Sequence, residues 1–193
     1  MNSNKEKIIN TAIELFKKNG YDETSINEIC KYCGLTKGTF YYHFNSKNEI
    51  ILNYWEYIFS SVTNVLPELI TISDARQKLW KISEYIFDQI SSLTASLIKE
   101  LLILGTQNRF KNFNQLNLVE QEINIEDDWR ILMLHKLVTQ AQLEGTIDKN
   151  KDVEILLKTY AFAIIGVELD WSSNYGNYNA KKILRQIFDI IFC

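Results

Sequence analysis

The sequence contains little of what interrupts helices or cross-links a chain. One proline, Pro67, occurs in 193 residues, and the seven glycines are spread thinly, so long helices can form without interruption. Three cysteines, an odd number, argue against a disulfide scaffold and favour a reducing cytoplasm. The segment from Met1 to Lys7 is polar, and no run of about 18 apolar residues exists. We therefore expect a cytoplasmic protein with neither a secretory signal nor a membrane span.

Histidine, the side chain most often found in catalytic and metal sites, is also scarce. The two histidines, His43 and His135, have no triad or metal-ligand spacing, and no glycine-rich phosphate loop is present. We therefore expect no enzyme, no metal and no cofactor. The formal charge of −3 gives no overall basic field. The first 50 residues nevertheless hold seven Lys against six Asp and Glu, which weakly favours a polyanion near the N-terminus.

Apolar residues recur at intervals of three and four along most of the chain, and no segment alternates with period two for long. This pattern predicts an all-α fold. Capping boxes, in which a serine is followed three residues later by glutamate, mark helix starts at Ser3, Ser25 and Ser46. Gly20 and Gly34 mark helix ends. The nine predicted helices span residues 4–19, 26–33, 37–44, 47–66, 75–92, 94–105, 126–144, 152–172 and 179–192.

The predicted helices divide into two domains. Residues 1–60 form a small N-terminal three-helix domain together with the start of the fourth helix, and residues 61–193 form a larger helical domain. The fourth helix is expected to stop at Pro67, because proline cannot continue a helix.

The second and third predicted helices, joined by a turn at Gly34, have helix-turn-helix proportions. Thr36 can cap the third helix, and Phe40 and Phe44 lie one turn apart, so they are predicted to anchor it inward. The outward residues then suit DNA, because they offer a cation, a glycine for close backbone approach, and hydroxyl, phenol and imidazole groups for phosphates. They are Lys37, Gly38, Thr39, Tyr41, Tyr42 and His43, followed by Lys47.

This pattern resembles the DNA-binding domain of the tetracycline-repressor (TetR) family over roughly residues 5–55. The matching residues are Thr24-Ser25-Ile26-Asn27-Glu28-Ile29, then Cys33-Gly34-Leu35-Thr36-Lys37-Gly38-Thr39-Phe40-Tyr41-Tyr42-His43-Phe44, then Ser46-Lys47-Asn48-Glu49-Ile50.

The resemblance implies an all-helical homodimer whose last two helices form the dimer interface. It also implies a repressor that binds a palindromic operator in double-stranded DNA and releases it when a small-molecule effector binds the C-terminal domain. Carried over by position, the candidate DNA contacts are Thr24, Ser25, Thr36, Lys37, Gly38, Thr39, Tyr41, Tyr42, His43 and Lys47.

Other interpretations remain open for several of these features. Tyr41 and Tyr42 could be ordinary surface aromatics, and His43 could be structural. Cys30 and Cys33 are interpreted as packing residues on one helix face, with a thiol switch as the alternative. An activator, or a helical interaction module without DNA binding, could use the same scaffold.

The C-terminal domain supplies only general hints about an effector. Several aromatic and apolar side chains could line a ligand cavity or simply form core, and nothing in the resemblance names the ligand. Gly166 could permit close helix packing, either inside the domain or at the dimer seam. The candidate ligand residues are Trp55, Phe59, Tyr85, Phe110, Trp129, Met133 and Tyr160.

Overall fold

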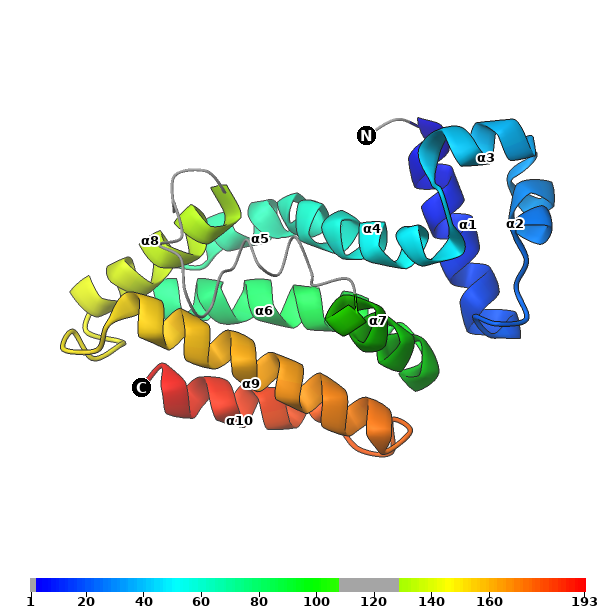
Figure 1. Ribbon diagram of the computed structural model, residues 1–193. Helices are drawn as coiled ribbons and strands as arrows, with labels where there is room; N and C mark the ends of the chain where they lie inside the picture. Colours follow the sequence, from blue (N-terminus) through cyan, green and yellow to red (C-terminus); the bar gives the residue numbers. More distant parts are fainter. Residues whose placement is uncertain (1–2, 108–128) are drawn as a thin grey trace.

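The computed structural model describes residues 3–107 and 129–193, apart from the side chains of residues 3, 55, 56, 59 and 105–107 (Figure 1). These two ranges contain ten α-helices, one 3-10 helix and no strand, which confirms the all-α class. One helix more than predicted is present. The helices are α1 (Ser3–Asn19), α2 (Ile26–Cys33), α3 (Lys37–His43), α4 (Lys47–Ser60), η1 (Ser61–Val65), α5 (Leu66–Thr71), α6 (Ala75–Ser91), α7 (Ala95–Gln107), α8 (Trp129–Leu143), α9 (Val153–Ser173) and α10 (Ala180–Ile191).

The helix boundaries in the N-terminal part follow from local capping. The Ser25 hydroxyl oxygen accepts a hydrogen bond from the Glu28 backbone N–H at 3.1 Å and starts α2. Gly34 ends α2 in the left-handed conformation, with φ of 63°, which glycine adopts without steric cost. The reciprocal half of this capping box is absent, because the Glu28 carboxylate instead accepts from the Asn19 amide at 2.9 Å.

The predicted end of the fourth helix at Pro67 is wrong. Helix α4 ends at Ser60, and Pro67 lies in the first turn of α5, where a missing N–H costs nothing. The break comes earlier, where the hydroxyls of Ser60, Ser61 and Thr63 each donate to a backbone carbonyl three residues before. Such bonds compete with regular helix geometry, and the chain forms the short 3-10 helix η1 there.

Two large apolar cores hold the fold together, and the first crosses the predicted domain boundary at residue 60. It joins buried residues of α1 to α4 with four leucines and isoleucines of α7. The second core lies among α6, α8, α9 and α10. Trp171 of α9 packs against both cores. Helix α7 therefore belongs structurally to the N-terminal half as well as to the C-terminal half. The four α7 residues of the first core are Leu97, Ile98, Leu101 and Leu104.

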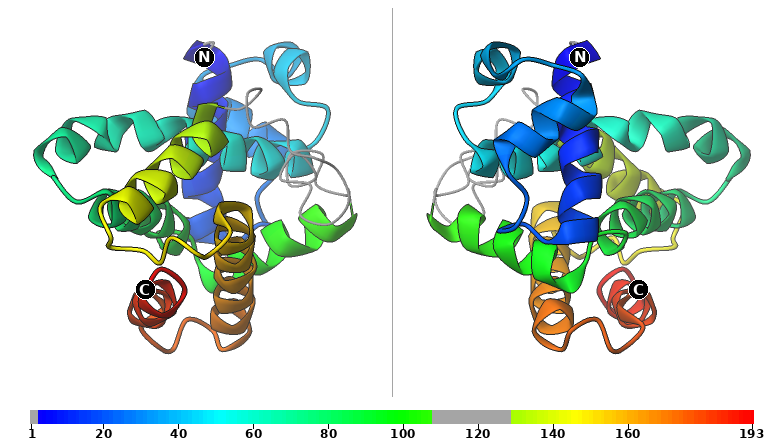
Figure 2. Two further views of the ribbon diagram at one scale, coloured as in Figure 1. Left: turned by 90° about the vertical axis from the view of Figure 1, so that its left-hand side faces the viewer. Right: turned by 90° about the vertical axis from the view of Figure 1, so that its right-hand side faces the viewer.

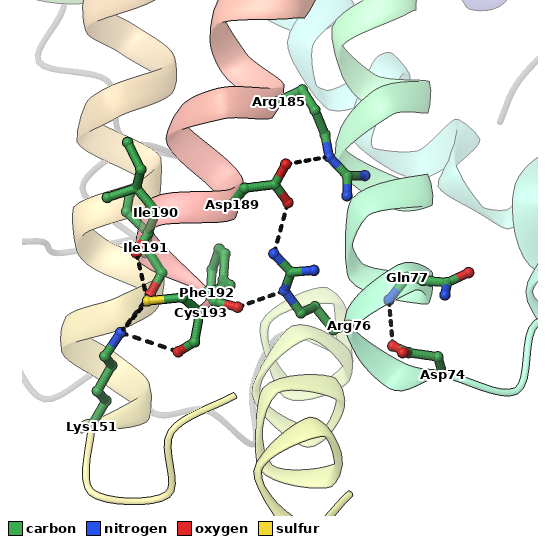
Figure 3. Close-up of polar contacts among 10 residues, drawn as sticks. All are labelled: Asp74, Arg76, Gln77, Lys151, Arg185, Asp189, Ile190, Ile191, Phe192 and Cys193. Atoms are coloured by element: carbon green, nitrogen blue, oxygen red, sulfur yellow. Dashed lines mark hydrogen bonds and ion pairs between the residues drawn. The ribbon is translucent and has the colours of Figure 1, made fainter. Parts of the chain in front are cut away.

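Arginine and aspartate side chains fasten the last helix to α6 (Figure 3). Arg76 of α6 donates from Nε to the Phe192 carbonyl at 2.5 Å and pairs with Asp189 at 2.7 Å. Arg185 donates to the other Asp189 oxygen at 2.9 Å, and this hydrogen bond lowers the pKa of Asp189. The two arginines share one carboxylate, so the end of α10 is fixed in position over α6.

The three-helix part and the last two helices occupy different sides of the molecule. Helix α3 lies at the top, while α9 and α10 lie side by side at the bottom, in all three views (Figures 1 and 2). Within the described ranges, no helix has the length and apolar character needed to cross a membrane.

Candidate DNA-binding surface

Helix α3 is held by its two phenylalanines, as predicted. Phe40 and Phe44 are 0% and 1% exposed, and both belong to the first core. Their rings are 5.9 Å apart, and the Lys5 ammonium of α1 lies 5.8 Å from the Phe44 ring. The start of the helix is fixed by Thr36, whose hydroxyl oxygen accepts from the Thr39 N–H at 3.1 Å. These contacts fix which face of α3 is turned towards the core.

The opposite face of α3 is open to solvent. Tyr42 is 81% exposed and Tyr41 52%, while Thr39 and His43 are half-buried. The Tyr42 and His43 rings meet edge to face at 4.9 Å, which restricts both side chains. A phenol and an imidazole that contact each other in this way lose less conformational freedom on binding a phosphate than two isolated side chains would.

Gly38 has no structural requirement inside this chain. Its φ is not positive, and an added Cβ would meet only the Thr36 hydroxyl oxygen at 3.7 Å, an ordinary contact. Alanine would be the better helix former at this position. The absence of a side chain instead leaves the backbone of α3 accessible from outside, as close approach to a DNA groove requires.

Two of the predicted contact residues serve the fold instead. Thr24 is buried, at 1% exposure, and its hydroxyl donates to the Gly20 carbonyl at 2.8 Å. A buried side chain cannot reach a phosphate, so Thr24 is corrected to a structural residue of the turn between α1 and α2.

The Lys47 ammonium is likewise occupied inside the protein. It donates to the backbone carbonyls of Tyr21, Asp22 and Thr24 at 2.5, 3.4 and 3.0 Å, and it lies 4.2 Å from the Tyr21 ring centroid. Burial lowers the pKa of Lys47. In the unbound chain these contacts direct the Lys47 ammonium towards the protein, and Lys47 joins α4 to the turn before α2.

Three further predicted contact residues are exposed to solvent. Ser25 and Thr36 are exposed N-cap residues whose oxygens accept from the backbone, and Lys37 is exposed at the start of α3. Cys30 and Cys33 are buried in the first core, as the packing interpretation expects.

Sequence reasoning missed Tyr21 and Asn48. The Tyr21 hydroxyl donates to the Asn48 side-chain oxygen, and burial raises the pKa of Tyr21 to about 12, with Glu100 of α7 contributing. This contact joins the α1–α2 turn to the start of α4, beside Lys47. No local pattern could reveal it, because 27 residues separate the two partners.

The four predicted ligand residues whose side chains the structure describes do not form one group. Tyr85 and Met133 pack against the same small cluster of Val62, Val65, Leu69 and Ile82. Tyr160 instead lies in the second core, and Trp129 is 48% exposed at the start of α8. The side chains of Trp55 and Phe59, and all of Phe110, lie outside the described residues.

The chain matches the family model for bacterial regulatory proteins of the tetR family over residues 8–54. It is 44% identical over 69 residues to the uncharacterized HTH-type transcriptional regulator YerO of Bacillus subtilis strain 168, an alignment that covers 36% of this chain and 24% of YerO. It is 27% identical over 203 residues to the HTH-type transcriptional regulator QacR of Staphylococcus aureus strain Mu50, covering 97% of this chain and 95% of QacR.

A solved structure has the same fold along its whole length. It is the transcriptional regulator FadR from Bacillus subtilis in complex with stearoyl-CoA, with a TM-score of 0.63, 20% identity and coverage of 97% of each chain. The family model, the two relatives and the helix-turn-helix geometry of α2 and α3 all indicate an HTH-type transcriptional regulator. Regulatory proteins of this kind are generally not enzymes. Residues 8–54 are thus similar to the N-terminal part of the tetR family of bacterial regulatory proteins, and the chain as a whole is similar to regulators of that fold.

Proposed function

We propose that this protein is a cytoplasmic transcriptional repressor, without catalytic activity, that binds a palindromic operator as a homodimer and releases it when a small molecule binds the C-terminal domain. The observation that carries the proposal is the divided surface of α3, which buries Phe40 and Phe44 and presents polar and aromatic groups outward. The proposed DNA contacts are Ser25, Thr36, Lys37, Gly38, Thr39, Tyr41, Tyr42 and His43.

The dimer is supported by unpartnered apolar residues on the last two helices. On α9, Ile155, Phe162 and Leu169 are 64%, 51% and 53% exposed and follow one another at intervals of seven. On α10, Ile183 and Ile190 are 39% and 71% exposed, again seven apart. A repeat of seven keeps side chains on one helix face, and exposed apolar stripes on neighbouring helices are typical of a protein interface.

Gly166 supports the same interface. It lies between Phe162 and Leu169 on α9 and is exposed, and an added Cβ would meet nothing within 4 Å. A glycine beside an exposed apolar stripe allows a second helix to approach closely. We therefore propose that Gly166 belongs to the dimer seam and not to packing within one chain.

The DNA contacts are tested by removing one phenol. An operator is first selected from a random duplex library with the wild-type protein, and affinity is then measured by fluorescence anisotropy at fixed salt. We expect Tyr42→Phe to weaken binding by roughly tenfold, since each half-site loses one phosphate hydrogen bond.

Tyr175→Phe is the matched control, because Tyr175 is 85% exposed but lies between α9 and α10. It should leave the affinity unchanged. Equal affinities of wild type and Tyr42→Phe would contradict the assignment of Tyr42 to the DNA contact.

A further inference from the structure

Two buried side-chain oxygen atoms in the described part of the chain lack a hydrogen-bond partner, and both belong to α9. They are the Tyr160 hydroxyl and Oε1 of Glu168. The Ser83 hydroxyl lies near Tyr160 and donates to the Leu79 carbonyl. Buried polar atoms are normally paired, and a buried carboxyl group without partners is especially unfavourable. Glu168 therefore requires an explanation beyond the packing of this chain.

The surroundings of Glu168 are apolar. The residue is 3% exposed, and burial alone raises its pKa to about 8, with no contribution from a neighbouring charge. Val167 before it belongs to the second core, and Trp171, one turn later, packs against both cores. The half of α9 that carries Glu168 lies beside α7 (Figures 1 and 2), and the two helices are in contact.

Below about pH 8 the Glu168 carboxyl group is protonated in the free chain, and a cation that binds beside it favours release of this proton to solvent. The resulting carboxylate is suited to one class of ligand. Carboxylate oxygens only accept hydrogen bonds, and a positive charge in an apolar site is bound well only if a negative charge compensates it. Leu102 of α7 and Trp171 of α9 are only partly buried and offer surface to an apolar body. The ligand that fits is an organic cation with N–H donors, such as a primary ammonium or amidinium group on an apolar skeleton.

We propose that Glu168 binds the cationic group of the effector at the contact between α7 and α9. This inference rests on the proposed function, because it names the ligand class for the proposed release from DNA. Helix α7 provides the connection, since its residues Leu97, Ile98 and Leu101 share a core with α1 to α4. A ligand that enters between α9 and α7 displaces a helix that also supports the DNA-binding part.

The test compares two probes that differ only in the polar group, phenethylammonium and phenethyl alcohol. Binding to the full chain is measured by isothermal titration calorimetry for the wild type, Glu168→Gln and Tyr160→Phe. We expect the wild type and Tyr160→Phe to prefer the ammonium by roughly tenfold or more. We expect Glu168→Gln, which keeps the size but not the charge, to bind both probes equally.

Three results would overturn the proposal. They are equal affinity of the wild type for both probes, a preference for the ammonium that persists in Glu168→Gln, and no binding of either probe to the wild type. The first and third need no variant, so they stand even if a substitution impairs folding.

Operator affinity, measured in the same samples, separates this inference from the proposed function. If phenethylammonium binds through Glu168 while no duplex is selected, the repressor proposal fails and the cation site stands. If an operator binds but the ammonium preference is missing, the repressor stands and the cation site fails.

Discussion

Glu168 makes the stability of the fold depend on pH. Its pKa is about 8 in the folded chain and 4.5 when solvated, so between these values the folded state holds the proton more tightly than the unfolded state. The free energy of unfolding therefore contains a contribution that is complete at low pH and is lost as the pH rises towards 8.

We expect the wild type to lose on the order of 1–3 kcal/mol more than Glu168→Gln between about pH 5 and about pH 8.5. Urea denaturation at several pH values measures this difference, and the variant cancels the titration of all other groups. Parallel stability curves for the two proteins would show that Glu168 is solvated or paired in solution.

Lys47 has a structural role that can be separated from its charge. Lys47→Met keeps the apolar stem over Tyr21 but removes the hydrogen bonds to three backbone carbonyls. We expect a loss of about 1–2 kcal/mol in the free energy of unfolding, because partly buried carbonyls lose a charged donor.

Lys149→Met, at an exposed position between α8 and α9, is the control and should leave stability unchanged. If Lys47→Met were as stable as the wild type, the carbonyl contacts would be dispensable, and the original assignment of Lys47 to phosphate binding would regain support.

At this scale, what the sequence could predict depended on how far apart the partners are. Phe40 and Phe44 were predicted correctly because helical spacing alone sets which face they share. The contacts that Lys47 and Thr24 make inside the protein could not be predicted. Lys47 reaches a carbonyl 23 residues away, and Thr24 is buried by tertiary packing. Glu168 was overlooked, although it lies four and eight residues after Ile164 and Tyr160, on the apolar face of its helix.

The turn before α3 and α3 itself each contain one glycine, and the two glycines differ in backbone conformation. Gly34 has φ of 63° and nothing within 4 Å of an added Cβ, so Gly34→Ala has only a conformational cost. Gly38 has ordinary helical geometry. We expect Gly34→Ala to lower the free energy of unfolding by about 1 kcal/mol, and Gly38→Ala to raise it by about 0.5–1 kcal/mol.

The effect of Gly38→Ala on operator affinity should be opposite to its effect on stability. Gly38→Ala adds a methyl group to the face of α3 that is proposed to enter the groove, so we expect weaker DNA binding from a more stable protein. Thermal unfolding and fluorescence anisotropy measure the two effects. An alanine variant at Gly38 that binds DNA as tightly as the wild type would remove Gly38 from the contact surface.

Element boundaries were predictable where a single residue decides them and not where several weak effects compete. The starts of α2 and α9 follow from Ser25 and Asp152, each of which accepts from a backbone N–H three residues later. The sequence pattern predicts the end of α4 at Pro67, but the hydroxyl side chains of Ser60, Ser61 and Thr63 end the helix earlier. Proline at the first turn begins a helix as readily as it ends the previous one.

At the scale of the whole molecule, the exposed stripe on α9 predicts how the protein assembles. Leu169→Lys places a charge within the apolar repeat and should shift the dimer to monomer, because a buried unpaired ammonium is strongly unfavourable. Ile70→Lys is a suitable control, since Ile70 is 83% exposed on α5.

Sedimentation velocity over a range of protein concentrations distinguishes the species. Both variants should remain helical by circular dichroism, because neither position is buried in a single chain. A dimeric Leu169→Lys protein would exclude the α9 stripe from the interface.

The overall architecture was the easiest part to predict, whereas the helices that share a core were harder to predict. Helical periodicity and the family resemblance gave the fold class, but periodicity within α7 could not show which half of the protein its leucines would join. Leu97 and Ile98 of α7 lie in one apolar core with residues of α1 to α4, and α7 contacts α4 directly.

This sharing of α7 limits how the protein can be re-engineered. A graft of residues 1–60 onto the sensor of another regulator would leave the underside of α1 and α4 facing a foreign helix with other shapes and sizes. A chimera is expected to fold only if the donor segment of the sensor reproduces Leu97, Ile98, Leu101 and Leu104, so the natural unit of exchange between regulators of this shape includes α7 and is discontinuous in the chain.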